Sequence, residues 1–82
     1  MLKLKIVSPE RIEFDGEAES VLVPGSKGQF EILNDHAPII STLNKGMVEY
    51  KLPKGDKLKL SIMGGFVEVQ QNVVSLCVEV NE

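Results

Sequence analysis

Hydrophobic and polar residues alternate along most of this 82-residue chain with a period of two. Apolar side chains occupy every second position near the start, at Leu2, Leu4 and Ile6, and again over residues 74–80. Alternate side chains of a β-strand point to the same side, so each segment predicts a strand with one face on a core. No window of a dozen residues has the spacing of an amphipathic helix.

Turn-forming residues interrupt this alternation every eight to twelve positions. We expect Asp15-Gly16 to turn the chain, Pro53 to Asp56 to connect a hairpin, and Gly64-Gly65 to be a bulge or a close backbone approach. Further breaks fall at Ser8-Pro9-Glu10, Pro24 to Gly28, Asn34 to His36, Asn44 to Gly46 and Gln71. Many short strands at this interval predict one all-β domain over residues 1–82, an antiparallel sandwich or a flattened barrel.

Composition and charge exclude several classes of protein. The net charge is −3 and the lysines are scattered, whereas a nucleic-acid-binding surface needs clustered basic residues. The apolar stretches are far shorter than the roughly 20 residues that cross a bilayer, and no signal peptide is visible at the N-terminus. The single cysteine, Cys77, cannot form an internal disulfide. These features predict a reducing, cytoplasmic setting, with Cys77 as a small buried strand residue.

The candidate chemistry is sparse. His36 is the only histidine. In a catalytic relay it would have to contact both Asp35 and a serine, either Ser26 or Ser41. Neighbouring side chains of an extended chain, such as those of Asp35 and His36, point apart and do not make such contacts. One histidine and one cysteine are too few for a zinc site, and the acidic residues between Glu10 and Glu19 alternate along strands. No helix is expected after the glycine-rich segment Gly25 to Gly28, whereas a phosphate-binding loop leads directly into a helix. We therefore expect no enzyme activity, no metal and no cofactor.

Several segments resemble a known family, in order and at similar spacing. They are Val7-Ser8-Pro9-Glu10, Phe14-Asp15-Gly16-Glu17, Val21-Leu22-Val23-Pro24-Gly25, Gly28 to Ile40 with its His-Ala-Pro sequence, Leu43 to Val48, and Gly64 to Val69. Over essentially its whole length the chain is similar to the N-terminal domain of the bacterial and chloroplast ATP synthase epsilon subunit. The resemblance implies a flattened antiparallel β-sandwich of about ten short strands.

The resemblance also implies a function. The chain would be a non-catalytic subunit of the central stalk, bound to the gamma subunit and to the c-type subunits of the membrane ring. It would be a peripheral component at the cytoplasmic face of the inner membrane, and would couple proton or sodium flow to ATP synthesis. By position, Ser26, Lys27, Gly28, Gln29 and Phe30 match the family's ring-facing loop. The positions that match residues close to gamma are Ser8, His36, Ala37, Pro38 and Thr42.

The sequence departs from the family in three places. Glu31 stands where relatives often carry glycine, Asn34-Asp35 replaces a common proline-containing turn, and the segment around Gln29 is less acidic than in relatives. In addition, two helices follow the sandwich in most bacterial relatives, where they can inhibit ATP hydrolysis. We expect a short form without this C-terminal helical hairpin, which would therefore not inhibit hydrolysis.

Two other interpretations of the sequence are open. A free-standing β-sandwich that binds peptides or carbohydrates would usually present an aromatic platform, and this chain has one Tyr, three Phe and no Trp. A small hydrolase would need a nucleophile beside a base, and none is evident.

Overall fold

The computed structural model describes residues 1–80, so Asn81 and Glu82, the last residues of the expected domain, lie outside the described part. Eight strands run through residues 1–80, and no helix is present among them. The strands are β1 (Leu2–Val7), β2 (Ile12–Ala18), β3 (Ser20–Val23), β4 (Phe30–Ile32), β5 (Ile39–Leu43), β6 (Gly46–Lys51), β7 (Lys57–Gln70) and β8 (Val73–Val80).

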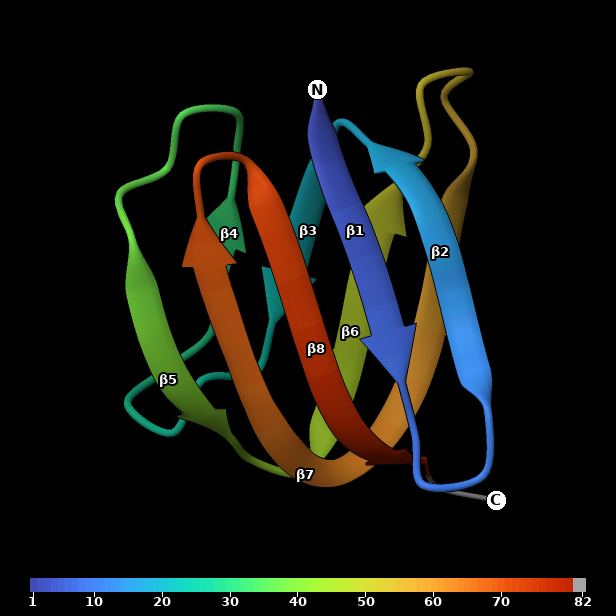
Figure 1. The fold of residues 1–82 in the computed structure, drawn as a ribbon. Coiled ribbons are helices and arrows are strands. Elements are labelled where there is room, and N and C mark those ends of the chain that lie inside the picture. The colour runs from blue at the N-terminus through green and yellow to red at the C-terminus, as the bar shows by residue number, and fades with distance from the viewer. Residues whose placement is uncertain (81–82) are drawn as a thin grey trace.

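The strands form two facing layers, as Figure 1 shows. One layer has the order β2-β1-β8-β7-β5, and the other has the order β7-β6-β3-β4. β7 belongs to both, because its first half pairs with β6 and its second half pairs with β8 and β5. The all-β sandwich expected from the sequence is confirmed, with eight strands in place of about ten.

The long bent strand β7 accounts for part of the lower strand count. An interruption of the alternation at Gly64-Gly65 would divide this region into two strands, but the chain stays extended through both glycines. A bulge shifts the pairing with β8 between Ile62 and Gly64. Gly65 has φ +150°, and a Cβ there would overlap the carbonyl oxygen of Cys77 and lie 2.8 Å from the Cα of Val78. The expected bulge and close backbone approach are therefore both present, within one strand that bends between the layers.

The prediction that Asp15-Gly16 turns the chain is wrong. Both residues lie inside β2, where Asp15 pairs with Lys5 and Gly16 pairs with Leu4. Gly16 instead makes room for an aromatic ring, since a Cβ there would lie 3.2 Å from Cζ of Phe14. The Phe14 ring packs on Tyr50 of the other layer, with ring centroids 4.8 Å apart. The chain leaves the first layer at Glu19, between β2 and β3.

The strand pairs are antiparallel except for β1 and β8, which run parallel. This parallel pair joins the two ends of the chain in the middle of the five-stranded layer. The core between the layers consists of aliphatic side chains, as the period-two pattern predicts, together with Tyr50. Its buried residues are Leu2, Leu4, Ile6, Ala18, Val21, Val23, Ile32, Leu43, Val48, Tyr50, Ile62, Val67, Val69, Val74, Leu76 and Val78.

Candidate interaction surfaces

The segment Pro24 to Gln29 connects β3 to β4 and is anchored to the edge of β5. The amide of Ser26 donates to the carbonyl oxygen of Thr42 at 3.0 Å, and the hydroxyl oxygens of these residues lie 2.9 Å apart. Gly25 is buried, and a Cβ there would come within 2.7 Å of the carbonyl oxygen of Gly28. The loop is therefore fixed at its base.

The tip of this loop presents a short polar surface. Ser26, Lys27, Gly28 and Gln29 are exposed, while Phe30 is half-buried and packs against the core. A hollow of about 620 Å³ lies between the loop and β5 and is lined by residues 25–30 and 39–42. The five residues that match the family's ring-facing loop by position thus lie together. Thr42, which the sequence assigns to gamma, borders the same hollow.

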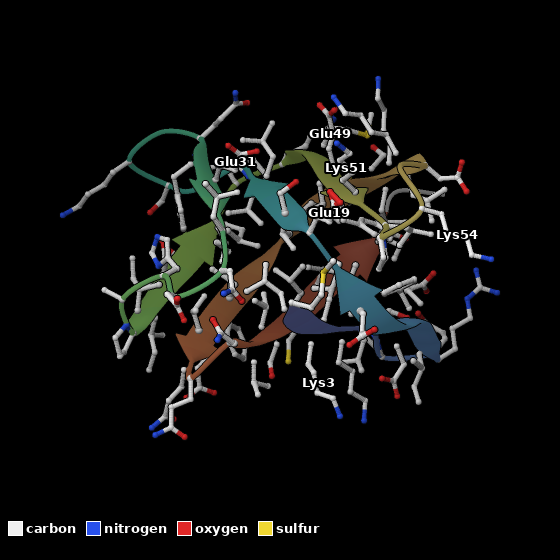
Figure 2. All side chains as sticks on the ribbon, turned by 90° about the horizontal axis from the view of Figure 1, so that it is seen from above. Lys3, Glu19, Glu31, Glu49, Lys51 and Lys54 are labelled. Carbon is white, nitrogen blue, oxygen red and sulfur yellow. The ribbon has the colours of Figure 1, made fainter. Side chains whose placement is uncertain are left out.

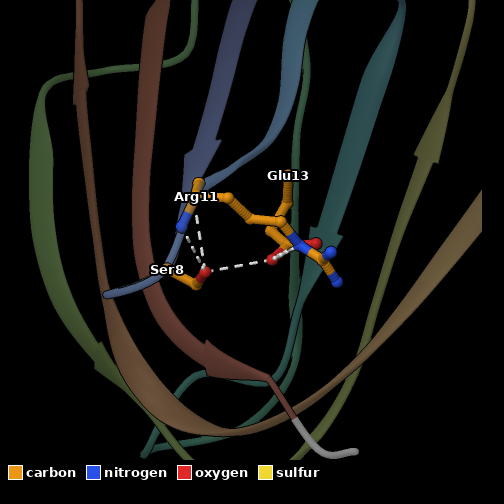
Figure 3. Close-up of polar contacts among 3 residues, drawn as sticks. All are labelled: Ser8, Arg11 and Glu13. Carbon is orange, nitrogen blue, oxygen red and sulfur yellow. Dashed lines mark hydrogen bonds and ion pairs between the residues drawn. The ribbon is translucent and has the colours of Figure 1, made fainter.

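Ser8, another residue assigned to gamma, holds the connection between β1 and β2 (Figure 3). Its hydroxyl oxygen lies 3.0 Å from Oε2 of Glu13 and accepts from the amide of Arg11 at 3.3 Å. Nε of Arg11 donates to the same carboxylate oxygen at 3.1 Å. The hydrogen bonds from Arg11 and Ser8 lower the pKa of the Glu13 carboxyl below its usual value of 4.5. The hydroxyl of Ser8 is therefore occupied inside the chain and shapes this loop.

Beside Ser8 lies an apolar hollow of about 510 Å³ at the end of the five-stranded layer. Its lining includes Val7, Met63, Phe66 and Cys77. Phe66 is 48% exposed and Met63 is 47% exposed, so two large apolar side chains are exposed beside the same hollow. Thr42 is the pairing partner of Phe66 on β5, so Ser8 and Thr42 flank this apolar area.

The sequence interpretation missed the surface role of Phe66 and Met63. One signal was available, because Phe66 alternates with the buried Val67 and Val69 and must point to the opposite side of β7. Cys77 was expected to be buried, but it is only half-buried and lines the hollow.

The segment His36-Ala37-Pro38 lies at the far end of β5, before the strand begins. The turn before it is fixed by Asn72, which accepts from the amide of Asp35 at 2.6 Å and donates to its carboxylate at 3.2 Å. Pro38 borders a shallow hollow that also includes Ile40 and Glu68, on the outer side of the same five-stranded layer. The residues assigned to gamma therefore do not form one cluster. Ser8, Thr42 and Pro38 border hollows beside the five-stranded layer, whereas the ring of His36 lies 6.3 Å from the ring of Phe30 in β4.

The outer faces of both layers carry charged side chains, and Lys3, Lys5, Asp15, Glu17 and Glu68 are exposed on the five-stranded layer. The outer face of the other layer is charged as well. Glu31, Glu49 and Lys51 project from it (Figure 2), and Nζ of Lys51 lies 3.7 Å from Oε1 of Glu19. Lys57 borders the same area. On the five-stranded layer the charged side chains share the outer face with the exposed Ile40, Phe66 and Val73, whereas Met47 is the exposed large apolar side chain at the centre of the other face.

The candidate relay residues His36, Ser26 and Ser41 make other contacts. Nδ1 of His36 is 2.8 Å from the carbonyl oxygen of Ala37, and the hydroxyls of Ser26 and Ser41 bond to Thr42. Within residues 1–80 there is no group of three acidic, histidine or cysteine residues that could hold a metal ion. The same range contains no helix that is long and apolar enough to cross a membrane.

A β-sandwich with exposed apolar side chains on one face and an anchored polar loop has the surface features of an interaction domain. Comparison with known proteins assigns the family. The sequence profile of "ATP synthase, Delta/Epsilon chain, beta-sandwich domain" matches residues 1–82. The chain therefore belongs to the delta/epsilon family of ATP synthase subunits, as the sequence resemblance indicated, and this family is not catalytic.

Relatives support this assignment. An ATP synthase epsilon chain of Leptospira interrogans is 50% identical over 76 residues, which cover 92% of this chain and 58% of the relative. One from Nitratiruptor is 42% identical over 95% of this chain and 60% of the relative. The chain thus spans a little more than half the length of these relatives.

Solved structures share the fold. A chain in the Euglena gracilis mitochondrial ATP synthase, described as OSCP/F1/c-ring, superposes with a TM-score of 0.89 at 22% identity. That match covers 94% of this chain and 49% of the other. A chain of the Tetrahymena thermophila mitochondrial ATP synthase, described as central stalk and c-ring, gives a TM-score of 0.82 at 14% identity, covering 95% of this chain and 63% of the other.

Proposed function

We propose that this chain is a rotor component of the ATP synthase central stalk, which links the gamma subunit to the membrane ring. The observation that carries the proposal is the family match over all 82 residues, together with relatives named epsilon chain at up to 50% identity. The structural neighbours come from central-stalk and c-ring assemblies, which supports the same role. The family match favours this role over a free-standing binding module.

A rotor component must hold two partners without deforming between them. The sandwich suits this task because its layers share the continuous strand β7 and an aliphatic core. Residues 1–82 act as one domain in this proposal. Torque passes from the ring through the sandwich to gamma, so that proton or sodium flow is coupled to ATP synthesis.

The outer face of the five-stranded layer is the proposed contact with gamma. Ser8, Thr42 and Pro38 surround this face, and the exposed Phe66 lies on it between Ser8 and Thr42. Apolar aromatic side chains at the centre of an interface commonly carry much of the binding energy. The two longer dimensions of the molecule are 28 and 25 Å, so that one face has about the area of a standard interface, roughly 800 Å² per partner.

The loop Ser26 to Phe30 is the proposed contact with the ring. Its exposed tip carries the ammonium of Lys27, and its base is fixed by Ser26 and Thr42. A loop anchored in this way transmits force better than a mobile one, because less of the displacement is lost in the loop itself. The chain would then lie at the cytoplasmic face of the inner membrane as a peripheral part of the complex.

The experiment is a calorimetric titration of the cognate gamma subunit with the wild-type chain and two matched variants. Phe66→Glu places a charge on the proposed gamma face and should weaken binding at least tenfold, because a buried unpaired carboxylate is costly. Met47→Glu is the control, since Met47 is 45% exposed on the other layer and Phe66 is 48% exposed. Equal affinity for both variants would remove the outer face from the proposal, and no binding by wild type would remove the gamma contact altogether.

A further inference from the structure

Among residues 1–80, β5 pairs with one strand, β7, so its other edge faces no neighbouring strand. The carbonyl of Thr42 points away from β7, because it accepts from the amide of Ser26 in the neighbouring loop. Main-chain groups of successive residues in an antiparallel strand alternate between its two sides. The N–H and C=O of Ile40, two residues earlier, therefore also point away from β7, toward the free edge of the sheet. None of the turn and loop bonds within residues 1–80 reaches Ile40.

Ile40 also has the most exposed large apolar side chain in the described part of the molecule, at 74%. Proteins usually protect sheet edges with charges, proline or covering loops. Here the loop from Gly25 covers only the end of β5 at Thr42 and Leu43, and Pro38 precedes the start of the strand. The middle of the edge is left open around Ile40.

The hollow beside this edge has room for an extended segment. It measures about 620 Å³, and its lining includes Phe30 and Ile39. Lys27 provides the one charged side chain of that lining, so the hollow accepts a neutral or acidic segment and repels a basic one. Unpaired edge groups, an exposed aliphatic side chain and an adjoining hollow are together what recognition by strand addition requires.

We propose that a short extended segment of the gamma subunit, neutral or acidic and with an aliphatic side chain, adds to β5 as an extra strand. The proposal rests on the proposed contact with gamma and specifies how part of that contact is made. The N–H and C=O of Ile40 pair with the main chain of the added segment. Ile40 pairs with Glu68, and Thr42, two positions along β5, pairs with Phe66, so all four side chains lie on the same face of the layer. The added strand would therefore continue the proposed gamma face.

Amide hydrogen exchange measured by NMR, in the free chain and in its complex with gamma, tests this directly. The amide of Ile40 should exchange at least tenfold more slowly in the complex, because it points to the open part of the edge that the added strand covers. The amide of Lys54, in the exposed β6–β7 turn, is the control and should not change. A complex that forms without slowing Ile40 would overturn strand addition and leave the gamma contact intact. Failure to form any complex would overturn both.

Two substitutions separate main-chain pairing from side-chain burial. Ile40→Pro removes the outward N–H but leaves the bonds between β5 and β7 in place, since edge strands tolerate proline there. It should weaken gamma binding at least tenfold, whereas Ile40→Val, which keeps the N–H, should stay within about threefold of wild type. Equal binding by the two variants would show that the edge is not paired. If Ile40→Pro does not fold, the exchange experiment on the unmodified chain decides the matter.

Discussion

Replacing Gly65 with alanine tests whether the close approach of β7 to β8 at the bend requires a glycine. Gly65 has φ +150°, a backbone conformation that side-chain-bearing residues rarely adopt, and strain of this kind costs about 1 to 3 kcal/mol. In addition, the new Cβ would overlap the carbonyl oxygen of Cys77 and lie 2.8 Å from the Cα of Val78. These are main-chain atoms of β8, so the overlap is relieved only by moving a strand, at a further cost of about 1 to 3 kcal/mol.

We therefore expect Gly65→Ala to lower the free energy of unfolding by about 3 kcal/mol or more. A domain of this size is typically stable by about 4 to 12 kcal/mol, so the loss is a large share of the total. At 4 to 8 °C per kcal/mol, the melting temperature should fall by about 12 °C or more. Urea denaturation followed by circular dichroism measures the effect, with an unchanged slope showing that the unfolding reaction is the same.

Two other glycines serve as controls. A Cβ at Gly64 would meet only the carbonyl oxygen of Leu43 at 3.5 Å, an ordinary contact, so Gly64→Ala should change stability by less than about 1 kcal/mol. Gly55 has φ +99° with no atom within 4 Å of a new Cβ, so Gly55→Ala should show the cost of backbone strain without overlap, about 1 to 2 kcal/mol. If Gly65→Ala were no less stable than Gly64→Ala, the argument from close approach would be refuted.

Three further predictions concern the loops. Lys27→Glu should reduce ATP-driven proton pumping in reconstituted vesicles while changing stability by no more than about 0.5 kcal/mol, and unchanged pumping would count against the ring contact. Gln71→Asn should stabilise the β7–β8 turn by up to about 1 kcal/mol in urea denaturation, because Gln71 has φ 49° and asparagine tolerates such angles better. The carboxyl of Glu13 should titrate below pH 4.5 in an NMR titration, and Arg11→Ala should raise its pKa. Since this pKa is lowered in the folded state, its stabilising effect is present above the unfolded pKa and is lost as the pH falls through the folded value.

Much of the fold follows from local patterns in the sequence. Alternation correctly predicts the buried face of β1 at Leu2, Leu4 and Ile6. When every second side chain of a strand is apolar, only one of its two faces can be packed against the core. The connection Pro53 to Asp56 and the turn at Gln71 are also confirmed. Both could be predicted because turn residues favour a turn through their own local backbone conformation.

The failures arise where distant residues decide the structure. Asp15-Gly16 has the composition of a turn, yet Gly16 is needed inside β2 because of Phe14 and its contact with Tyr50. The parallel pairing of β1 with β8 joins residues about 70 positions apart, and no local pattern encodes it.

Of the candidate interaction surfaces, one could be predicted from the sequence and the other could not. The grouping of Ser26 to Phe30 could be predicted because these residues are consecutive. The apolar area around Phe66 could not, because it is assembled from β1, β7 and β8 by their long-range pairing.

The most direct test of the central claim is the coupling of ATP hydrolysis to proton or sodium transport. Membrane vesicles that contain the cognate ATP synthase without its epsilon chain would be assayed for hydrolysis and ion pumping, before and after addition of this chain. The account predicts that the wild-type chain raises the number of ions pumped per ATP hydrolysed, and that Phe66→Glu does so only at much higher concentration. A pumping ratio that stays unchanged at saturating wild-type chain would contradict the proposed role as a link between gamma and the ring.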